Sequence, residues 1–139
     1  MTTASQSAIA PSISERELQE HVVAMAKALG WSVFHPWLSI HSAAGWPDLF
    51  MVRGPVALAV ELKTETGKVS WQQTVWLGDL ARVPGIQTAV WRPTDLISGH
   101  VEQLLRQRQC RKCGAPILFA GETKLCGACA VEAVEGTDG

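Results

Sequence analysis

The sequence lacks both a large net charge and a long apolar run, and each absence excludes a class of protein. Twelve Lys and Arg residues against thirteen Asp and Glu leave a net charge of -1 over 139 residues, so no global positive field indicates nucleic acid. Wholly apolar runs such as Val56 to Val60 are far too short to cross a bilayer. The first eleven residues have neither the basic nor the apolar segment of an export signal. We therefore expect a soluble, cytoplasmic protein that meets any polyanion through a local patch.

Cysteine is absent before residue 110 and then occurs four times, as Cys110, Cys113, Cys126 and Cys129. The four residues form two Cys-x-x-Cys pairs. In a reducing compartment this spacing favours metal ligation, although a redox pair or disulfides remain alternatives. Four thiolates complete a tetrahedral zinc site with no open position, so the Zn²⁺ would be structural. We expect a zinc-binding module, a four-cysteine knuckle, over residues 107–131.

Basic side chains gather around the first cysteine pair, at Arg106, Arg108, Arg111 and Lys112. One interpretation is a DNA-binding patch that contacts phosphates. The alternative is solvated charge at a helix C-terminus, where basic residues are favoured in any case.

The remaining chain has the pattern of one α/β domain over residues 14–106, with a flexible leader at 1–13 and a flexible tail at 132–139. Ser14 and Glu17 have the spacing of a capping box, and apolar residues then recur at helical spacing up to Gly30. Further along, the pattern predicts strands over 32–35, 48–53, 56–63 and 87–91, a helix over 70–83, and one last helix from Thr94 or Asp95 to Leu105. The order is α, β, β, β, α, β, α, which favours a mixed sheet because the helix between the last two strands acts as a crossover.

The hairpin at residues 48–63 carries the residues with the clearest chemistry. With a two-residue loop at Gly54 and Pro55, Asp48 lies directly opposite Glu61. Such opposed positions have Cβ atoms about 4.5–5.5 Å apart, and two carboxylates there repel unless a cation lies between them. A hard divalent ion satisfies this demand. Lys63 points to the same side as Glu61 and could stabilise a nucleophile or a charged phosphate.

A structural interpretation of the same residues competes with the catalytic one. Asp48 could cap the turn after Pro47, and Glu61 and Lys63 could be solvated residues at a strand end. The acidic residues of the first helix, Glu15, Glu17 and Glu20, would then only complement the helix dipole.

These residues resemble a known family. Asp48, followed by Glu61-Leu62-Lys63 at the end of the next strand, is similar to the motif of the PD-(D/E)XK nucleases, and the αβββαβ order is similar to their restriction-endonuclease-like core. A closer resemblance, over about Ser14 to Leu105, is to the VRR-NUC group, the virus-type replication and repair nucleases. The matching features are Gly45-Trp46-Pro47-Asp48-Leu49, Glu61-Leu62-Lys63-Thr64-Glu65, Gly67-Lys68, Ser70 with Gln73 and Trp76, and Val90-Trp91-Arg92-Pro93.

The resemblance implies a role for each matching residue. Asp48, Glu61 and the backbone carbonyl of Leu62 would bind Mg²⁺ or Mn²⁺, Lys63 would be the catalytic lysine, and Gln73 would brace the site. The family also has a glutamate on its first helix, and Glu15, with Gln19 one turn later, fits this position best. His35 and His41 are candidates for phosphate or metal contact, with polar loop residues as the plainer interpretation.

The expected function is metal-dependent hydrolysis of DNA, with branched DNA such as a junction or flap as the implied substrate in phage-type replication, repair or recombination. Symmetrical cleavage of two strands would call for a homodimer. The alternative is a non-catalytic DNA-binding or scaffold protein, in which the zinc knuckle binds and the acidic site is vestigial.

Overall fold

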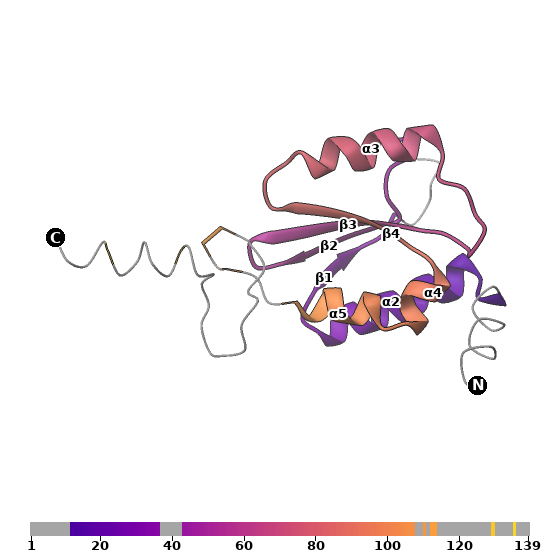
Figure 1. The fold of residues 1–139 in the computed structure, drawn as a ribbon, viewed down its shortest axis with the longest axis horizontal. Coiled ribbons are helices and arrows are strands. Elements are labelled where there is room, and N and C mark those ends of the chain that lie inside the picture. The colour runs from indigo at the N-terminus through magenta and orange to yellow at the C-terminus, as the bar shows by residue number, and fades with distance from the viewer. Residues whose placement is uncertain are drawn as a thin grey trace.

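The computed structural model describes residues 12–36 and 43–107, together with residues 110, 112–113, 129 and 135. In these segments the chain forms a four-stranded mixed sheet with helices on both faces (Figure 1). The predicted leader and tail lie almost entirely outside the described residues. Within the described part, no helix has the length and apolar character needed to cross a membrane.

The first helix, α2 (Glu15–Ala28), begins at the predicted capping box. The Ser14 hydroxyl accepts a hydrogen bond from the backbone N–H of Glu17 at 3.2 Å, and the Glu17 carboxylate accepts one from the N–H of Ser14 at 2.9 Å. Both bonds satisfy N–H groups that a helix start leaves unpaired. Leu18, Val22 and Ala26 are buried and place one face of α2 against the sheet.

The strands are β1 (Ser32–Phe34), β2 (Leu49–Arg53), β3 (Val56–Leu62) and β4 (Ile86–Trp91), and they lie in this order across the sheet. β1–β2 and β2–β3 pair antiparallel, whereas β3 and β4 are parallel. The predicted hairpin register is confirmed, because Leu49 pairs with Val60 and Arg53 with Val56. This register brings Asp48, the residue before β2, beside Glu61 of β3.

The crossover helix α3 (Trp71–Ala81) joins β3 to β4 and lies on the face of the sheet opposite to α2. Its N-cap is Ser70, as predicted, and Gln73 completes a second capping box. No residue of α3 is fully buried, and Trp71 and Val75 are exposed. The main core therefore lies between the sheet and α2, and α3 is the thinner of the two helical layers.

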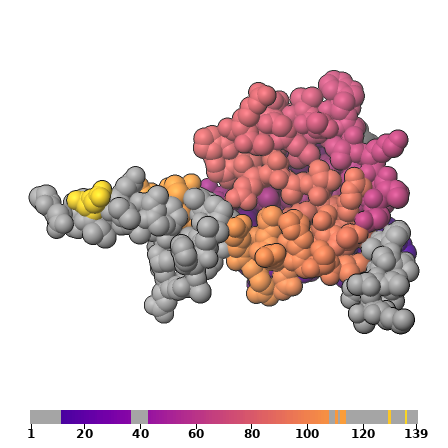
Figure 2. Space-filling view, in the orientation of Figure 1, coloured from indigo at the N-terminus to yellow at the C-terminus, as the bar shows by residue number. Residues whose placement is uncertain are grey.

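The prediction of a single last helix is wrong, because the structure has two helices in this region. α4 (Pro93–Ile97) and α5 (His100–Arg106) are separated at Gly99, which has a φ of +85°. A left-handed φ cannot continue an α-helix and is accessible to glycine without steric cost. Both helices lie on the α2 side of the sheet, and Figure 2 shows their orange surface below the rose surface of α3.

Arg53, at the end of β2, holds the end of α5 against the core. Its guanidinium donates to the carbonyl of Leu105 at 2.7 Å, to that of Leu29 at 3.3 Å and also to that of Gln107. It also stacks on Trp31, 4.6 Å from the ring centroid. Partial burial lowers the pKa of Arg53. These contacts fix the point at which the chain leaves the core toward the cysteines.

Candidate functional site

Two acidic residues meet where β2 begins and β3 ends. The Asp48 carboxylate accepts a hydrogen bond from the backbone N–H of Leu62 at 2.8 Å, so Asp48 is pinned to the neighbouring strand. Glu61 is only 2% exposed, and among the described residues it is the sole charged residue in the buried class. A buried carboxylate requires partners, because the loss of hydration disfavours its charged form.

The environment of Glu61 strongly favours the protonated form when no cation is present. Burial raises the pKa of Glu61 from 4.5 to about 8, and the neighbouring Asp48 carboxylate adds to this rise. Lys63 acts in the opposite direction. One oxygen of Glu61, Oε2, is buried and receives no hydrogen bond from the described residues. A divalent cation between the two carboxylates would satisfy this oxygen and relieve the repulsion.

Lys63 and Gln73 both reach the other oxygen of Glu61, Oε1. The Gln73 side-chain amide donates to it at 2.7 Å, and the Lys63 Nζ atom lies 3.6 Å from it. The Gln73 side-chain carbonyl also accepts the N–H of Ser70 at 2.8 Å. Gln73 therefore ties the start of α3 to the buried carboxylate, which is the kind of contact that a bracing role requires.

The turn that follows Lys63 is held by Arg92, the residue between the end of β4 and the proline that begins α4. One nitrogen of its guanidinium, Nη1, donates to the carbonyls of Thr64 and Gly67, each at 2.7 Å. The backbone N–H of Lys63 donates to the carbonyl of Trp91 at 3.0 Å. Trp91 therefore holds the backbone of Lys63 itself, and Arg92 holds the turn that follows it. The sequence offers one indication of this role of Arg92: it is an arginine just before a helix that begins with proline.

A cleft of about 260 Å³ opens beside Asp48. Its lining comes from α2, the segment just after β1, the segment before β2, and α3. The lining residues are Gln19, Pro36, Ala43, Ala44, Gly45, Trp46, Pro47, Asp48 and Gln73. Two of the predicted site residues, Asp48 and Gln73, therefore face one accessible cleft.

The segment at residues 43–47 forms one wall of this cleft and is fastened to α3. The indole N–H of Trp76 donates to the carbonyl of Ala44 at 3.1 Å, and the Trp46 and Trp76 rings pack edge to face with centroids 5.0 Å apart. Gly45 has a φ of +86°, and a Cβ there would come within 2.5 Å of the Gln72 carbonyl carbon. Only glycine permits this close approach. The wall is therefore preformed.

The structure does not bring every candidate to the cleft. Glu15 lies at the exposed start of α2 and is not among the lining residues, whereas Gln19, one turn later, is. His35 is half-buried just after β1 and does not line the cleft either. His41 lies outside the described residues.

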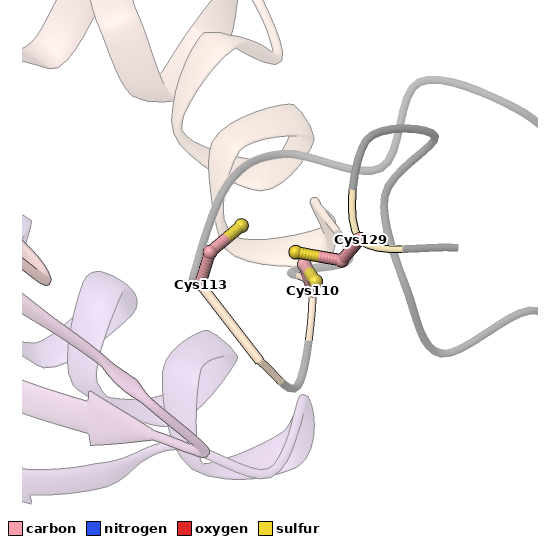
Figure 3. A group of neighbouring side chains, drawn as sticks. All are labelled: Cys110, Cys113 and Cys129. Atoms are coloured by element: carbon pink, nitrogen blue, oxygen red, sulfur yellow. The ribbon is translucent and has the colours of Figure 1, made fainter. Parts of the chain in front are cut away.

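Three of the four predicted zinc ligands come together. The sulfur atoms of Cys110, Cys113 and Cys129 all lie within 4.8 Å of one another, and Figure 3 shows the three side chains close together. Sulfurs around a tetrahedral zinc, each about 2.3 Å from the ion, are separated by about 3.8 Å. The cluster can therefore hold a metal such as zinc after small adjustments. Cys126 lies outside the described residues.

The predicted basic patch is described only in part. Arg106 forms an exposed pair with Glu102 on α5, at 2.9 Å. Lys112 lies between the first two cysteines of the cluster, and Arg108 and Arg111 lie outside the described residues.

Comparison of the sequence and fold with protein-family models, curated proteins and solved structures finds no significant match.

Proposed function

We propose that this protein is a metal-dependent DNA nuclease of the PD-(D/E)XK type, similar to the VRR-NUC group. The observation that carries the proposal is that Asp48, just before β2, lies beside Glu61 of the paired strand β3, with Lys63 near the Glu61 carboxylate. A second observation is the buried Glu61 oxygen that no described donor reaches. The donor set consists of carboxylate oxygens, which suit Mg²⁺ or Mn²⁺.

In this proposal Asp48, Glu61 and the backbone carbonyl of Leu62 hold the divalent ion. Such an ion, when bound, orients and acidifies a water molecule and offsets negative charge on the phosphate. The reaction is hydrolysis: the water oxygen bonds to phosphorus, the bond from phosphorus to one sugar oxygen breaks, and that oxygen leaves with a proton.

The remaining residues have supporting roles that follow from their contacts. The Lys63 ammonium, close to Glu61, can hold the attacking water or stabilise charge that develops on the phosphate. Gln73 donates to Glu61 and so fixes the direction of its carboxylate. No contact with a described residue supports a role for Glu15, and only the family resemblance assigns it the position of the first-helix glutamate.

We also propose that Cys110, Cys113 and Cys129, with Cys126 as the fourth ligand, bind one structural zinc ion. Such a site would fold a segment of about twenty residues that is too short to form its own core. Arg106, Arg108, Arg111 and Lys112 would then present positive charge to the DNA backbone. The protein would act on branched DNA in the cytoplasm, as a homodimer where two strands are cut symmetrically.

The test is a cleavage assay on labelled linear, flapped and four-way DNA with Mn²⁺ or Mg²⁺. The parent protein is expected to cut at least one of these DNAs. Asp48→Asn is expected to abolish cleavage, whereas the matched control Asp79→Asn, on the exposed side of α3, retains it. An absence of cleavage on the whole panel, combined with DNA binding that requires the zinc module, would favour the non-catalytic alternative.

A further inference from the structure

The cleft beside Asp48 has the chemistry of a binding site for an uncharged, flat group. Its described lining contains Trp46, two prolines, two alanines, a glycine and two glutamines, and Asp48 is the only charged member. Its described lining residues include no lysine or arginine that could pair with a phosphate. The cleft adjoins the proposed reaction centre through Asp48, and its other described lining residues are uncharged.

Its size limits what can enter. A volume of about 260 Å³ is slightly smaller than typical small-molecule sites, which are about 300–1,000 Å³. A single heterocycle fits this space, whereas a base pair within a stacked duplex does not. Because the wall at residues 43–47 is fastened to α3 by Trp76 and by the close approach of Gly45, the space exists before any ligand arrives.

Gln19 supplies a polar group suited to the edge of such a ring. Its side-chain amide makes no hydrogen bond to another described residue, so both its donor and its acceptor are available to a ligand. Gln73, by contrast, is already engaged by Glu61 and Ser70. An aromatic side chain for stacking and an amide for edge contact are the two elements by which proteins hold unstacked bases.

We infer that this cleft receives one unpaired nucleobase, from the nucleotide next to the phosphodiester bond that is cut. The inference rests on the proposed nuclease function and extends it to the choice of substrate. A base held in an intact duplex must first be unstacked, which costs free energy that a flap or a single-stranded end does not require. Flapped or single-stranded DNA is therefore the preferred substrate, and uninterrupted duplex is a poor one.

The experiment removes one base at a time. Flapped DNA is prepared with an abasic analogue at each successive position around the mapped cleavage site, and KM and kcat are measured with Mn²⁺. Loss of the base beside the cut bond is expected to raise KM about tenfold, in line with the stacking of one base on an aromatic residue. Removal of bases farther away is expected to change KM by less than about twofold, because those bases do not reach the cleft.

Variants connect the effect to the cleft. In Gln19→Ala the penalty for the missing base is expected to shrink, and in the matched control Gln103→Ala, on the exposed side of α5, it is expected to stay at about tenfold. Trp46→Leu is expected to remove most of the penalty. Since Trp46 also packs against Phe50 and Trp76, the far-UV spectrum of this variant is checked first, and Gln19→Ala carries the test if Trp46→Leu does not fold.

The outcomes separate the inference from the function on which it rests. Normal cleavage with no position sensitive to base removal would overturn the base-binding cleft and leave the nuclease intact. A sensitive position whose penalty is the same in Gln19→Ala and Gln103→Ala would also overturn the assignment to this cleft. Failure to cut any DNA would overturn the nuclease proposal and the inference with it.

Discussion

The carboxylate of Asp48 accepts the backbone N–H of Leu62 at 2.8 Å, so one acidic residue pins the strand that carries the other. The contact fixes the separation between the two proposed metal-binding carboxylates through a single hydrogen bond across the hairpin. An asparagine at position 48 can accept the same bond with its amide oxygen. Asp48→Asn therefore removes the charge and keeps the geometry, which makes it the appropriate probe of the site.

The raised pKa of Glu61 predicts how stability changes with pH when no divalent ion is added. The unfolded chain loses the proton from Glu61 near pH 4.5, whereas the folded chain keeps it up to about pH 8. Between these values the folded state binds more protons, so the free energy of unfolding falls as pH rises. In Glu61→Gln this part of the pH dependence is expected to disappear.

Urea unfolding at several pH values between about 5 and 8, without added Mg²⁺ or Mn²⁺ and without a chelator, measures this effect. Glu20→Gln, which changes an exposed glutamate of α2, is the control and should follow the parent. Parallel curves for Glu61→Gln and the parent would contradict the assigned protonation of Glu61.

Lys63 and Glu61 are expected to separate metal binding from catalysis. Glu61→Ala should weaken Mn²⁺ binding and abolish cleavage, because it removes a proposed ligand. Lys63→Ala removes a cation 3.6 Å from Glu61, so Mn²⁺ affinity should stay equal or rise slightly while the rate of the chemical step falls about 10²–10³-fold.

Calorimetric Mn²⁺ titration and single-turnover cleavage check both variants. Lys68→Ala, which removes an exposed lysine of the loop after Lys63, is the control for charge alone. Normal single-turnover rates in Lys63→Ala, or a loss explained entirely by weaker DNA binding, would make Lys63 a surface or phosphate-contact residue.

Arg92 is expected to matter for activity although it does not line the cleft. Arg92→Ala removes the hydrogen bonds that hold the carbonyls of Thr64 and Gly67, and hydrogen bonds to a charged group contribute about 1.5–3 kcal/mol. We expect a lower melting temperature and a lower kcat with little change in KM. Arg92→Lys should recover only part of the loss, since lysine lacks the planar fork of guanidinium.

Thermal unfolding and steady-state cleavage measure both effects of Arg92. The control is Arg16→Ala, because the Arg16 side chain is 89% exposed and its ion pair with Glu20 lies on the surface. If Arg92→Ala lowered the melting temperature but left kcat unchanged, the turn after Lys63 would have no part in positioning that residue.

The cysteine cluster predicts about one zinc ion per chain in protein purified without a chelator. Metal analysis of the parent and of Cys113→Ser measures it, and the variant should lose the zinc. Most of the far-UV signal should survive, because the core between α2 and the sheet contains none of these cysteines. A complete loss of that signal would show that the cysteine module and the core do not fold separately.

Local chemistry allows much of this fold to be derived from the sequence. The helix starts are short-range signals, since a helix start needs acceptors for its free N–H groups. Ser14, with Glu17, marks the start of α2, and Ser70 marks the start of α3. The two-residue loop at Gly54 and Pro55 sets the register of β2 and β3, and with it the juxtaposition of Asp48 and Glu61. The sequence pattern does not predict the break between α4 and α5 at Gly99, because an isolated glycine within a helical pattern is often tolerated.

Only the tertiary structure decided the environment of these residues. Spacing places Glu61 opposite Asp48, but its 2% exposure, and the loss of hydration that together with Asp48 raises its pKa, arise from the packing around β3. The hydrogen bonds of Arg92 to the turn from Thr64 to Gly67 likewise join residues far apart in the chain. The same is true of the cleft between α2 and the 43–47 segment. Burial, desolvation and cavities are properties of packed surfaces, so a one-dimensional pattern can indicate which residues to consider but not how their surroundings change them.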